Sequence, residues 1–109
     1  ANFISQGDFT INFNQIPESF TLHQNFPNPF NSSTRIWYDL PLPSKVRIDI
    51  FDISGRSIKK LVQGEFQAGS FFVDWSGENN LNEKVSSGIY FYRITTGDFN
   101  QSIKMVLIK

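Results

Sequence analysis

The chain contains 109 residues, and its ten basic and ten acidic side chains cancel to a formal net charge of zero. This length predicts a single domain that is large enough for a core of its own. A neutral chain has no excess of positive charge to attract nucleic acid or an anionic membrane surface, so neither partner is expected. The absence of cysteine excludes disulfides, thiolate chemistry and cysteine-ligated zinc.

No apolar run approaches the ~20 residues that a membrane-spanning helix needs, so no membrane-spanning segment is expected. No signal peptide opens the sequence, and we expect Ala1 to be a cut point within a longer protein and Lys109 to be its C-terminus. Residues 9–13 alternate like a strand, but Ile16-Pro17 breaks the pattern. Residues 1–16 are therefore expected to be a linker or an edge strand from the upstream region, and residues 17–109 to be the domain.

The segment at residues 25–31 reads Asn-Phe-Pro-Asn-Pro-Phe-Asn. Each proline fixes φ at about −65° and removes a backbone donor, and each pushes the residue before it toward extended geometry. The segment is therefore predicted to be a stiff, extended entry that is neither a helix nor a central strand. Phe26 and Phe30 flank it, and both are expected to anchor it against the core.

After this entry, apolar and polar residues alternate with a period of two, which is typical of half-buried strands. The predicted strands are residues 34–40, 45–52, 57–62, 70–75, 88–96 and 99–108. Short strands at regular spacing, separated by Gly, Pro and Asn, predict an all-β fold, an antiparallel immunoglobulin-like β-sandwich of about seven strands. The Cys–Trp–Cys pattern of antibody domains is absent, so only the architecture is predicted.

Particular residues are expected to close the turns and fill the core. Gly55 is the expected φ > 0 residue of the turn after residue 52, in which Asp52 accepts backbone hydrogen bonds. Trp75 is expected in the core, with its indole N–H on a backbone carbonyl. The strand at residues 88–96 has aromatic residues on both faces, so it is expected to be central in its sheet.

Several motifs recur in order along residues 17–109, and together they resemble the C-terminal sorting domains (type A) of the type IX secretion system. The likeness is carried by residues 16–34, 50–56, 68–69, 75–77, 87–93 and 104–109. Two positions depart from the family pattern: Ser32, where proline is usual, and Ser76, where aspartate is more common. The middle section also resembles the immunoglobulin-like domain of the flagellar hook-capping protein. The Asn-Pro-Phe entry and the basic-apolar end favour the sorting family.

The resemblance implies a non-catalytic domain that the outer-membrane secretion machinery reads. It would direct a larger cargo protein, fused upstream in the same chain, through the periplasm to the cell surface or the outside. The structural motif positions that it implies are Asn25, Pro27, Asn28, Pro29, Phe30, Gly55, Trp75 and Gly88. The residues that it implies for recognition by the translocon are Lys104, Met105, Val106, Leu107, Ile108 and Lys109.

Two lysines bracket four apolar residues at this end, which by itself indicates a buried last strand with a charged terminus. The functional interpretation adds that an end strand offers unpaired backbone groups for strand addition, and that two ammonium groups can orient a partner. The two interpretations are compatible, and we expect both to hold.

Other functions are considered for the same sequence. Trp37 lies on the polar face of its predicted strand, so a surface module that binds carbohydrate through exposed aromatic side chains is the main alternative, and an inert spacer is a third. His23 is the only histidine, and no serine is placed to form a triad with it, so catalysis is not expected. Oxygen ligands for calcium cluster at Asp74, Glu78, Asn79, Asn80 and Asn82, but their spacing matches no EF-hand and favours an Asn-rich turn. No cofactor or metal is expected.

Overall fold

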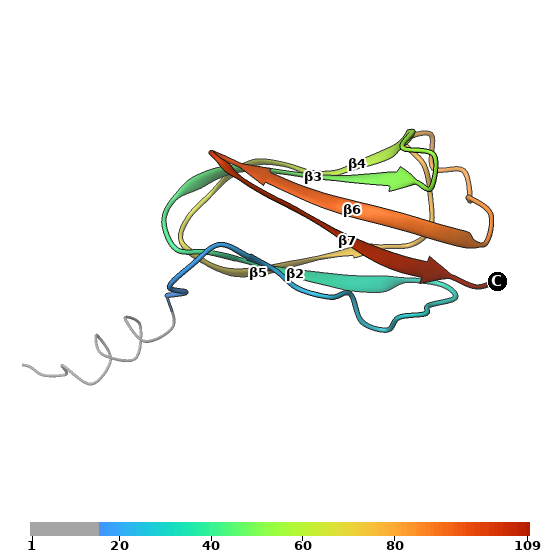
Figure 1. Ribbon diagram of the computed structural model, residues 1–109, viewed down its shortest axis with the longest axis horizontal. Coiled ribbons are helices and arrows are strands. Elements are labelled where there is room, and N and C mark those ends of the chain that lie inside the picture. Colours follow the sequence, from blue (N-terminus) through green and yellow to red (C-terminus); the bar gives the residue numbers. More distant parts are fainter. Residues whose placement is uncertain (1–15) are drawn as a thin grey trace, which may run out of the picture.

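The computed structural model of the chain describes residues 16–109, which form two antiparallel β-sheets packed face to face (Figure 1). The strands are β1 (Thr21–Leu22), β2 (Thr34–Leu40), β3 (Ser44–Asp52), β4 (Ser57–Phe66), β5 (Gly69–Trp75), β6 (Gly88–Thr96) and β7 (Phe99–Leu107). One sheet has the order β1-β2-β5 and the other β4-β3-β6-β7. The fold is an immunoglobulin-like β-sandwich, as the sequence predicts, and the described residues contain no helix that could cross a membrane.

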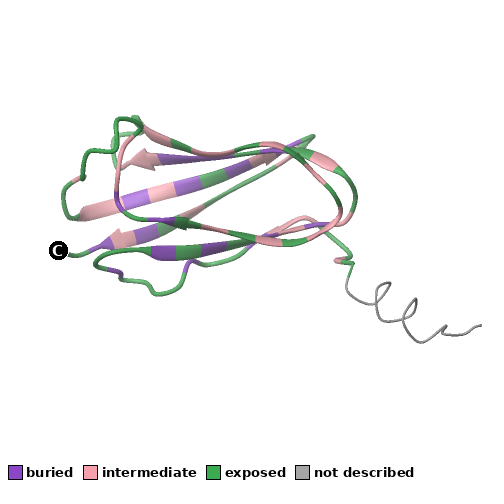
Figure 2. Ribbon diagram, turned by 180° about the vertical axis from the view of Figure 1, so that it is seen from behind, coloured by how far each residue is buried: buried purple, intermediate pink, exposed green. Residues whose placement is uncertain are grey.

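The core forms between the sheets because every second residue of a strand points inward. In β2, Ile36, Tyr38 and Leu40 are buried while Arg35 and Trp37 are exposed, and a similar alternation runs along β5 and β6 (Figure 2). The buried apolar residues are Leu22, Phe30, Ile36, Tyr38, Leu40, Val46, Ile48, Ile50, Trp75, Tyr90, Tyr92, Ile94, Met105 and Leu107. Strand β6 lies between β3 and β7, which confirms that it is central.

The strand predicted at residues 57–62 is longer than its sequence pattern suggests. The pattern ends this strand before Gln63-Gly64, and that prediction is wrong, because β4 continues to Phe66. Strand β3 supplies the missing partners, with Val46 opposite Gly64. Two register shifts between β3 and β4 also disturb the alternation in β4, which hides the strand in the sequence.

The turn between β3 and β4 is closed by Asp52, as predicted. Its Oδ1 accepts hydrogen bonds from the backbone N–H groups of Ser54 and Arg56, both at 3.0 Å, and from the Ser54 hydroxyl at 2.8 Å. Its Oδ2 accepts from the Arg56 guanidinium at 3.0 Å. Gly55 has φ = 89°, which a residue with a side chain rarely adopts. These hydrogen bonds, chiefly that of the Ser54 side chain, lower the pKa of Asp52 to about 2.

This depressed pKa predicts an acid-dependent loss of stability. The folded-state pKa lies below that of the unfolded chain, so the contribution of Asp52 is present above about pH 4 and is lost as the pH falls toward about 2. We expect the urea unfolding midpoint of the unaltered domain to fall between about pH 5 and about pH 2.5, and that of Asp52→Asn to fall less. Equal falls in the two proteins would contradict this account of the turn.

Candidate recognition site at the last strand

The last strand, β7, lies at the edge of the four-stranded sheet and contains most of the residues that the resemblance implies for recognition. Met105 and Leu107 point into the core and are 0% and 2% exposed. Lys104 is exposed and Val106 is half-buried, and both point to the opposite face. Ile108 follows the strand and is 52% exposed. The last strand therefore has a buried face and an outer face, and its end is charged, as the two bracketing lysines predict.

A second segment runs along the outer edge of β7, and we call residues 24–30 the strap. The strap first pairs with β2, where Phe26 and Arg35 exchange backbone hydrogen bonds of 3.0 and 2.9 Å. It then crosses to the other sheet and forms a parallel bridge from Phe30 to Leu107. The two X-Pro peptide bonds within it, at Pro27 and Pro29, are cis. The strap is therefore neither a helix nor a central strand, as its prolines predict.

The strap occupies the backbone groups that an edge strand would otherwise present. The Phe30 N–H donates to the Val106 carbonyl at 3.0 Å, and the Ile108 N–H donates to the Phe30 carbonyl at 2.8 Å. The Asn28 side-chain oxygen accepts from the Val106 N–H at 3.0 Å, and the Gln24 side-chain amide donates to the Lys104 carbonyl at 3.0 Å. The prediction of a free backbone edge at this end is therefore wrong, because residues far away in sequence cover it.

A buried polar network holds the strap in place. The Asn25 side chain is 2% exposed, and its amide donates to the Pro27 carbonyl at 3.1 Å and to the Thr34 hydroxyl at 2.8 Å. The Thr34 hydroxyl in turn donates to the Pro27 carbonyl at 2.8 Å. The Gln24 amide donates to the Asn25 side-chain oxygen at 2.7 Å. Buried polar groups are costly unless they are paired, so this network fixes one conformation of the strap.

The two phenylalanines of the strap have different roles. Phe30 is 2% exposed and packs on Trp75, with ring centroids 5.8 Å apart, so it anchors the strap as predicted. Phe26 is 77% exposed, so its predicted anchoring role is wrong. Phe26 pairs through its backbone with Arg35, which leaves its ring on the outer surface. The anchor is completed by Tyr90, whose ring meets Trp75 edge-on at 5.4 Å.

The remaining motif positions have mixed roles. The Trp75 indole N–H donates to the Glu78 carbonyl at 2.9 Å, as predicted. Pro29 is exposed. Gly88 opens β6, where an added Cβ would meet only the Tyr90 ring at 4.0 Å, so nothing in the structure requires glycine there. Gly77 is not among the implied motif positions, but it has φ = 70°, and a Cβ added to it would lie 3.4 Å from the Leu107 side chain.

The two lysines of the implied recognition set are both exposed, and neither takes part in an ion pair among residues 16–109. The Lys104 residue lies opposite Phe91 of β6. The Lys109 backbone N–H donates to the Ser87 hydroxyl at 2.9 Å, so the last residue is held close to the start of β6. Their ammonium groups are available to a partner outside the domain.

Sequence reasoning missed two further contacts, both made by His23, which lies between β1 and the strap. The Tyr92 hydroxyl donates to the His23 carbonyl, and burial raises the pKa of Tyr92 well above its usual value. The His23 ring lies 2.7 Å from the Asp39 carboxylate, so the single histidine contacts an acid of β2. A lone histidine and a tyrosine in an alternating strand carry no signal of these partners, since the contacts join residues far apart in the sequence.

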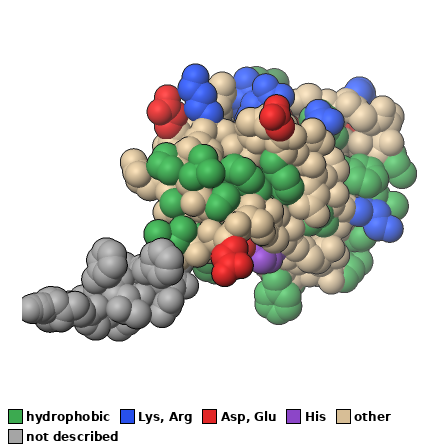
Figure 3. Space-filling model, turned by 60° about the vertical axis from the view of Figure 1, so that its left-hand side comes forward, with side chains coloured by type: hydrophobic (Ala, Val, Ile, Leu, Met, Phe, Trp, Pro, Cys, Tyr) green, Lys and Arg blue, Asp and Glu red, His purple; other side chains and the backbone are tan. Residues whose placement is uncertain are grey.

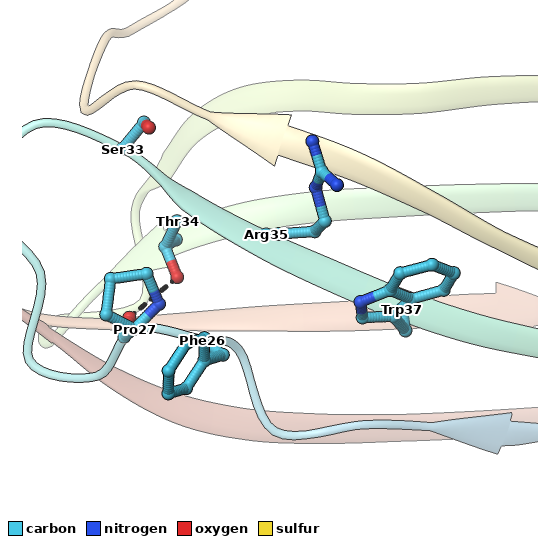
Figure 4. A pocket seen from close by; sticks show the side chains of 6 residues that line it. All are labelled: Phe26, Pro27, Ser33, Thr34, Arg35 and Trp37. Atoms are coloured by element: carbon cyan, nitrogen blue, oxygen red, sulfur yellow. Dashed lines mark hydrogen bonds between the residues drawn. The ribbon is translucent and has the colours of Figure 1, made fainter.

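Trp37, the residue considered for the alternative of carbohydrate binding, lies on the outer face of the three-stranded sheet. It is 41% exposed and packs on Phe72 with ring centroids 5.0 Å apart and planes tilted by 56°. A hollow of about 430 Å³ beside it is lined by Phe26, Pro27, Ser33, Thr34, Arg35 and Trp37 (Figure 4). The Arg35 guanidinium lies 3.8 Å above the Phe72 ring and pairs with Asp74. The hollow is therefore aromatic on its surface, but its rings do not share one plane.

Of the polar residues considered for calcium, Asp74 lies in β5 and pairs with Arg35, and the others lie in the loop between β5 and β6, which is held by hydrogen bonds of its asparagine side chains. The Asn79 side-chain oxygen accepts from the N–H groups of Leu81 and Glu83 at 2.9 and 3.0 Å. The Asn80 side-chain oxygen accepts from the Lys60 N–H at 3.0 Å and so covers part of the β4 edge. No group of three or more His, Asp or Glu side chains that could hold a metal occurs within the described part of the chain. The side-chain oxygens of Asn79 and Asn80 therefore accept backbone hydrogen bonds, which hold the loop in place and attach it to β4.

Several solved structures share the fold. The chain is similar to dimeric latent PorU from Porphyromonas gingivalis, with a TM-score of 0.66 and 17% sequence identity over 84% of this chain and 10% of that one. It is also similar to PorZ, an essential surface component of the type-IX secretion system of the same bacterium, with a TM-score of 0.55 and 17% identity over 84% of this chain and 12% of that one. The chain thus spans about a tenth of either protein.

No curated protein matches the chain. The family model described as the secretion system C-terminal sorting domain matches residues 24–109, which is most of the chain. The match begins at the strap and ends after β7, so it includes both segments of the candidate site. Domains of this family serve in targeting proteins for export toward the cell surface or the outside, and they are generally non-catalytic. The chain therefore belongs to the secretion system C-terminal sorting domain family.

Proposed function

We propose that residues 17–109 direct a larger cargo protein, fused upstream in the same chain, through the type IX secretion system. The cargo would cross the periplasm and reach the cell surface or the outside, and the outer-membrane machinery would be the partner. The observation that carries this proposal is that the two ends of the family match bind each other. Gln24, at the start of the match, donates to the Lys104 carbonyl of β7.

The contact between the ends also suggests what the machinery reads. The strap pairs with the outer backbone edge of β7 from the Lys104 carbonyl to the Ile108 N–H, so a partner cannot add a strand to this part of the edge while the strap is in place. The side chains of Lys104, Val106 and Ile108, which point away from the core, are accessible instead. We therefore propose that recognition uses the outer side chains of residues 104–109, with the strap as the element that holds them in position.

Substitution of the two lysines tests this proposal separately from the fold. We expect a reporter fused ahead of residues 1–109 to reach the surface of a bacterium with the type IX machinery. Lys104→Gln with Lys109→Gln is expected to lower the exported fraction. The same variant should lose no more than about 1 kcal/mol of unfolding free energy for each exposed lysine.

Each outcome of this export assay has one meaning. Retention of the unaltered fusion in the periplasm would contradict the sorting function itself. Normal export of the double variant would show that the machinery does not read the lysines. Urea unfolding of the purified variants is the control for stability. Lys84→Gln with Gln67→Glu, at exposed positions in the loops after β5 and β4, lowers the net charge by the same two units and is the control for charge.

A second candidate function is carbohydrate binding at the hollow beside Trp37, favoured by three exposed aromatic rings, those of Phe26, Trp37 and Phe72. The tilt between the Trp37 and Phe72 rings argues against stacking on a flat glycan chain. We therefore expect no retention of the unaltered domain on insoluble polysaccharides. Clear retention that Trp37→Ala abolishes, with the unfolding midpoint unchanged, would favour this second function.

A further inference from the structure

The outward face of the four-stranded sheet carries a positive charge that the whole chain does not. The strand registers show which residues share this face. One row across the four strands consists of Lys60 in β4, Asp49 in β3, Arg93 in β6 and Ser102 in β7. Its basic residues are Lys45, Arg47, Lys60, Arg93 and Lys104, and its acidic residues are Asp49 and Glu65. Five positive and two negative charges leave a net charge of +3 on the face, whereas the chain as a whole is neutral.

Most of these cations have no acidic partner within the domain. Asp49, the one acid in the middle of the face, is buried and pairs with Arg47 at 2.8 Å. Among residues 16–109, no ion pair includes Lys45, Lys60, Arg93 or Lys104. Lys and Arg side chains gather along the upper margin of Figure 3, with fewer Asp and Glu side chains among them, on the side where β3 and β4 lie in Figure 1. The face therefore presents several unneutralised charges to solvent.

Apolar side chains lie among these charges. Phe51 and Phe91 lie opposite each other on β3 and β6, and the Arg93 guanidinium lies 4.8 Å above the Phe51 ring. A hollow of about 310 Å³ at this place is lined by both phenylalanines, Arg93 and Ile53, which is 70% exposed. A second hollow of about 440 Å³ is lined by Lys45, Arg47, Gln63, Glu65 and Thr95 of the same face. Arginine beside aromatic rings is typical of the central residues of protein–protein interfaces.

We propose that this face binds an acidic protein surface that also carries apolar side chains. The partner protein is the export component that recognises β7. The inference rests on the proposed function, since Lys104 and Val106 belong both to this face and to the proposed recognition residues. The mixture of aromatic rings and cations fits a protein partner better than a purely anionic polymer. Charge complementarity would speed the encounter and exclude basic surfaces.

The experiment leaves Lys104 and Lys109 intact, so that it differs from the test of the proposed function. The face variant is Lys45→Gln, Lys60→Gln and Arg93→Gln in the reporter fusion with residues 1–109. The control variant is Ser33→Asp, Gln67→Glu and Lys84→Gln, at exposed positions away from the face, which lowers the net charge by the same three units. We expect the face variant to reduce the rate of export by about tenfold, and the control variant to be exported like the unaltered fusion.

Purified chains give a measurement that does not depend on export. A copolymer of glutamate and tyrosine serves as the acidic, aromatic polypeptide probe, and polygalacturonate as the anionic polysaccharide probe. We expect the unaltered chain and the control variant to bind the copolymer, and the face variant to bind it about tenfold more weakly. Urea unfolding of each variant shows whether the fold is intact, and Lys45→Gln with Lys60→Gln is the milder variant if Arg93→Gln unfolds the domain.

Three results would overturn the inference. Normal export of a folded face variant would show that the face has no role in recognition. Equal loss of export in the face and control variants would show that net charge, rather than this face, is read. Tighter binding of polygalacturonate than of the copolymer would assign the face to a polysaccharide. If the unaltered fusion is not exported, the proposed function fails and the identity of the partner fails with it, and the copolymer measurement then decides only whether the face binds an acidic polypeptide.

Discussion

Phe30→Ala is expected to lower the free energy of unfolding by about 3–5 kcal/mol, the usual cost of removing a buried aromatic ring. Phe30 is 2% exposed and packs on Trp75. Its backbone N–H donates to the Val106 carbonyl, and its carbonyl accepts from the Ile108 N–H. Removal of the ring leaves a cavity beside Trp75 and releases the strap from the core. Urea unfolding, followed by tryptophan fluorescence, measures the change.

Phe26→Ala is the matched control, because the same residue type stands four positions earlier in the same strap. Phe26 is 77% exposed, so its loss is expected to change the unfolding free energy by no more than about 0.5 kcal/mol. Equal effects of the two substitutions would contradict the assignment of Phe30 as the single aromatic anchor of the strap.

The contrast between these two phenylalanines shows the limit of what sequence can predict. Both flank a proline-rich segment and both carry the same local signal, so the sequence predicts two anchors. The structure separates them because Phe26 pairs with β2 through its backbone, whereas Phe30 has already crossed to β7. Which ring becomes buried depends on where the segment changes sheets, and that is decided by pairing with strands distant in sequence.

The fold was more predictable than the site. Alternation with a period of two indicates where most strands lie, since it reflects burial of one face and needs no knowledge of partners. It fails at β4, where two register shifts and Gly64 interrupt the pattern although the ladder to β3 continues. Similarly, Asp52 and Gly55 could be assigned to their turn because the hydrogen bonds involved are local.

The closure of the β7 edge could not be predicted, because it depends on contacts across the whole chain. Gln24 meets Lys104 and Asn28 meets Val106, which are pairs separated by 80 and 78 positions. Thr34 reads as an ordinary strand residue, yet its hydroxyl completes the buried network with Asn25. Polar residues in a strap give no local sign of which backbone groups they will satisfy.

The closed edge changes how the last strand can act. An open edge strand would invite pairing with other chains, and the strap prevents this between Lys104 and Ile108 by using the same backbone groups. The export signal, if it lies in this strand, is then displayed on a folded surface of defined geometry. It follows that substitutions that release the strap would affect recognition and stability together, whereas exposed side chains of β7 can be changed with little effect on the fold.

Deletion of residues 105–109 is therefore expected to unfold the domain as well as abolish export. It removes the buried side chains of Met105 and Leu107, each worth about 2–5 kcal/mol, together with the backbone partner of Phe30. This loss is comparable with the total stability of an ordinary domain, about 5–15 kcal/mol. Near-ultraviolet circular dichroism of the truncated chain should lose its aromatic bands, and thermal unfolding should show no cooperative transition.

The lysine variant and the deletion together separate an effect on recognition from an effect on folding. Lys104→Gln with Lys109→Gln retains every buried contact of β7, so a loss of export in that variant reports on recognition alone. The truncated chain, by contrast, would fail to be exported even if the machinery recognised no residue of this strand, because an unfolded domain has no folded surface to recognise. A truncated chain that still unfolds cooperatively near the midpoint of the unaltered domain would show that β7 and the strap contribute little to the core, contrary to the burial of Met105, Leu107 and Phe30.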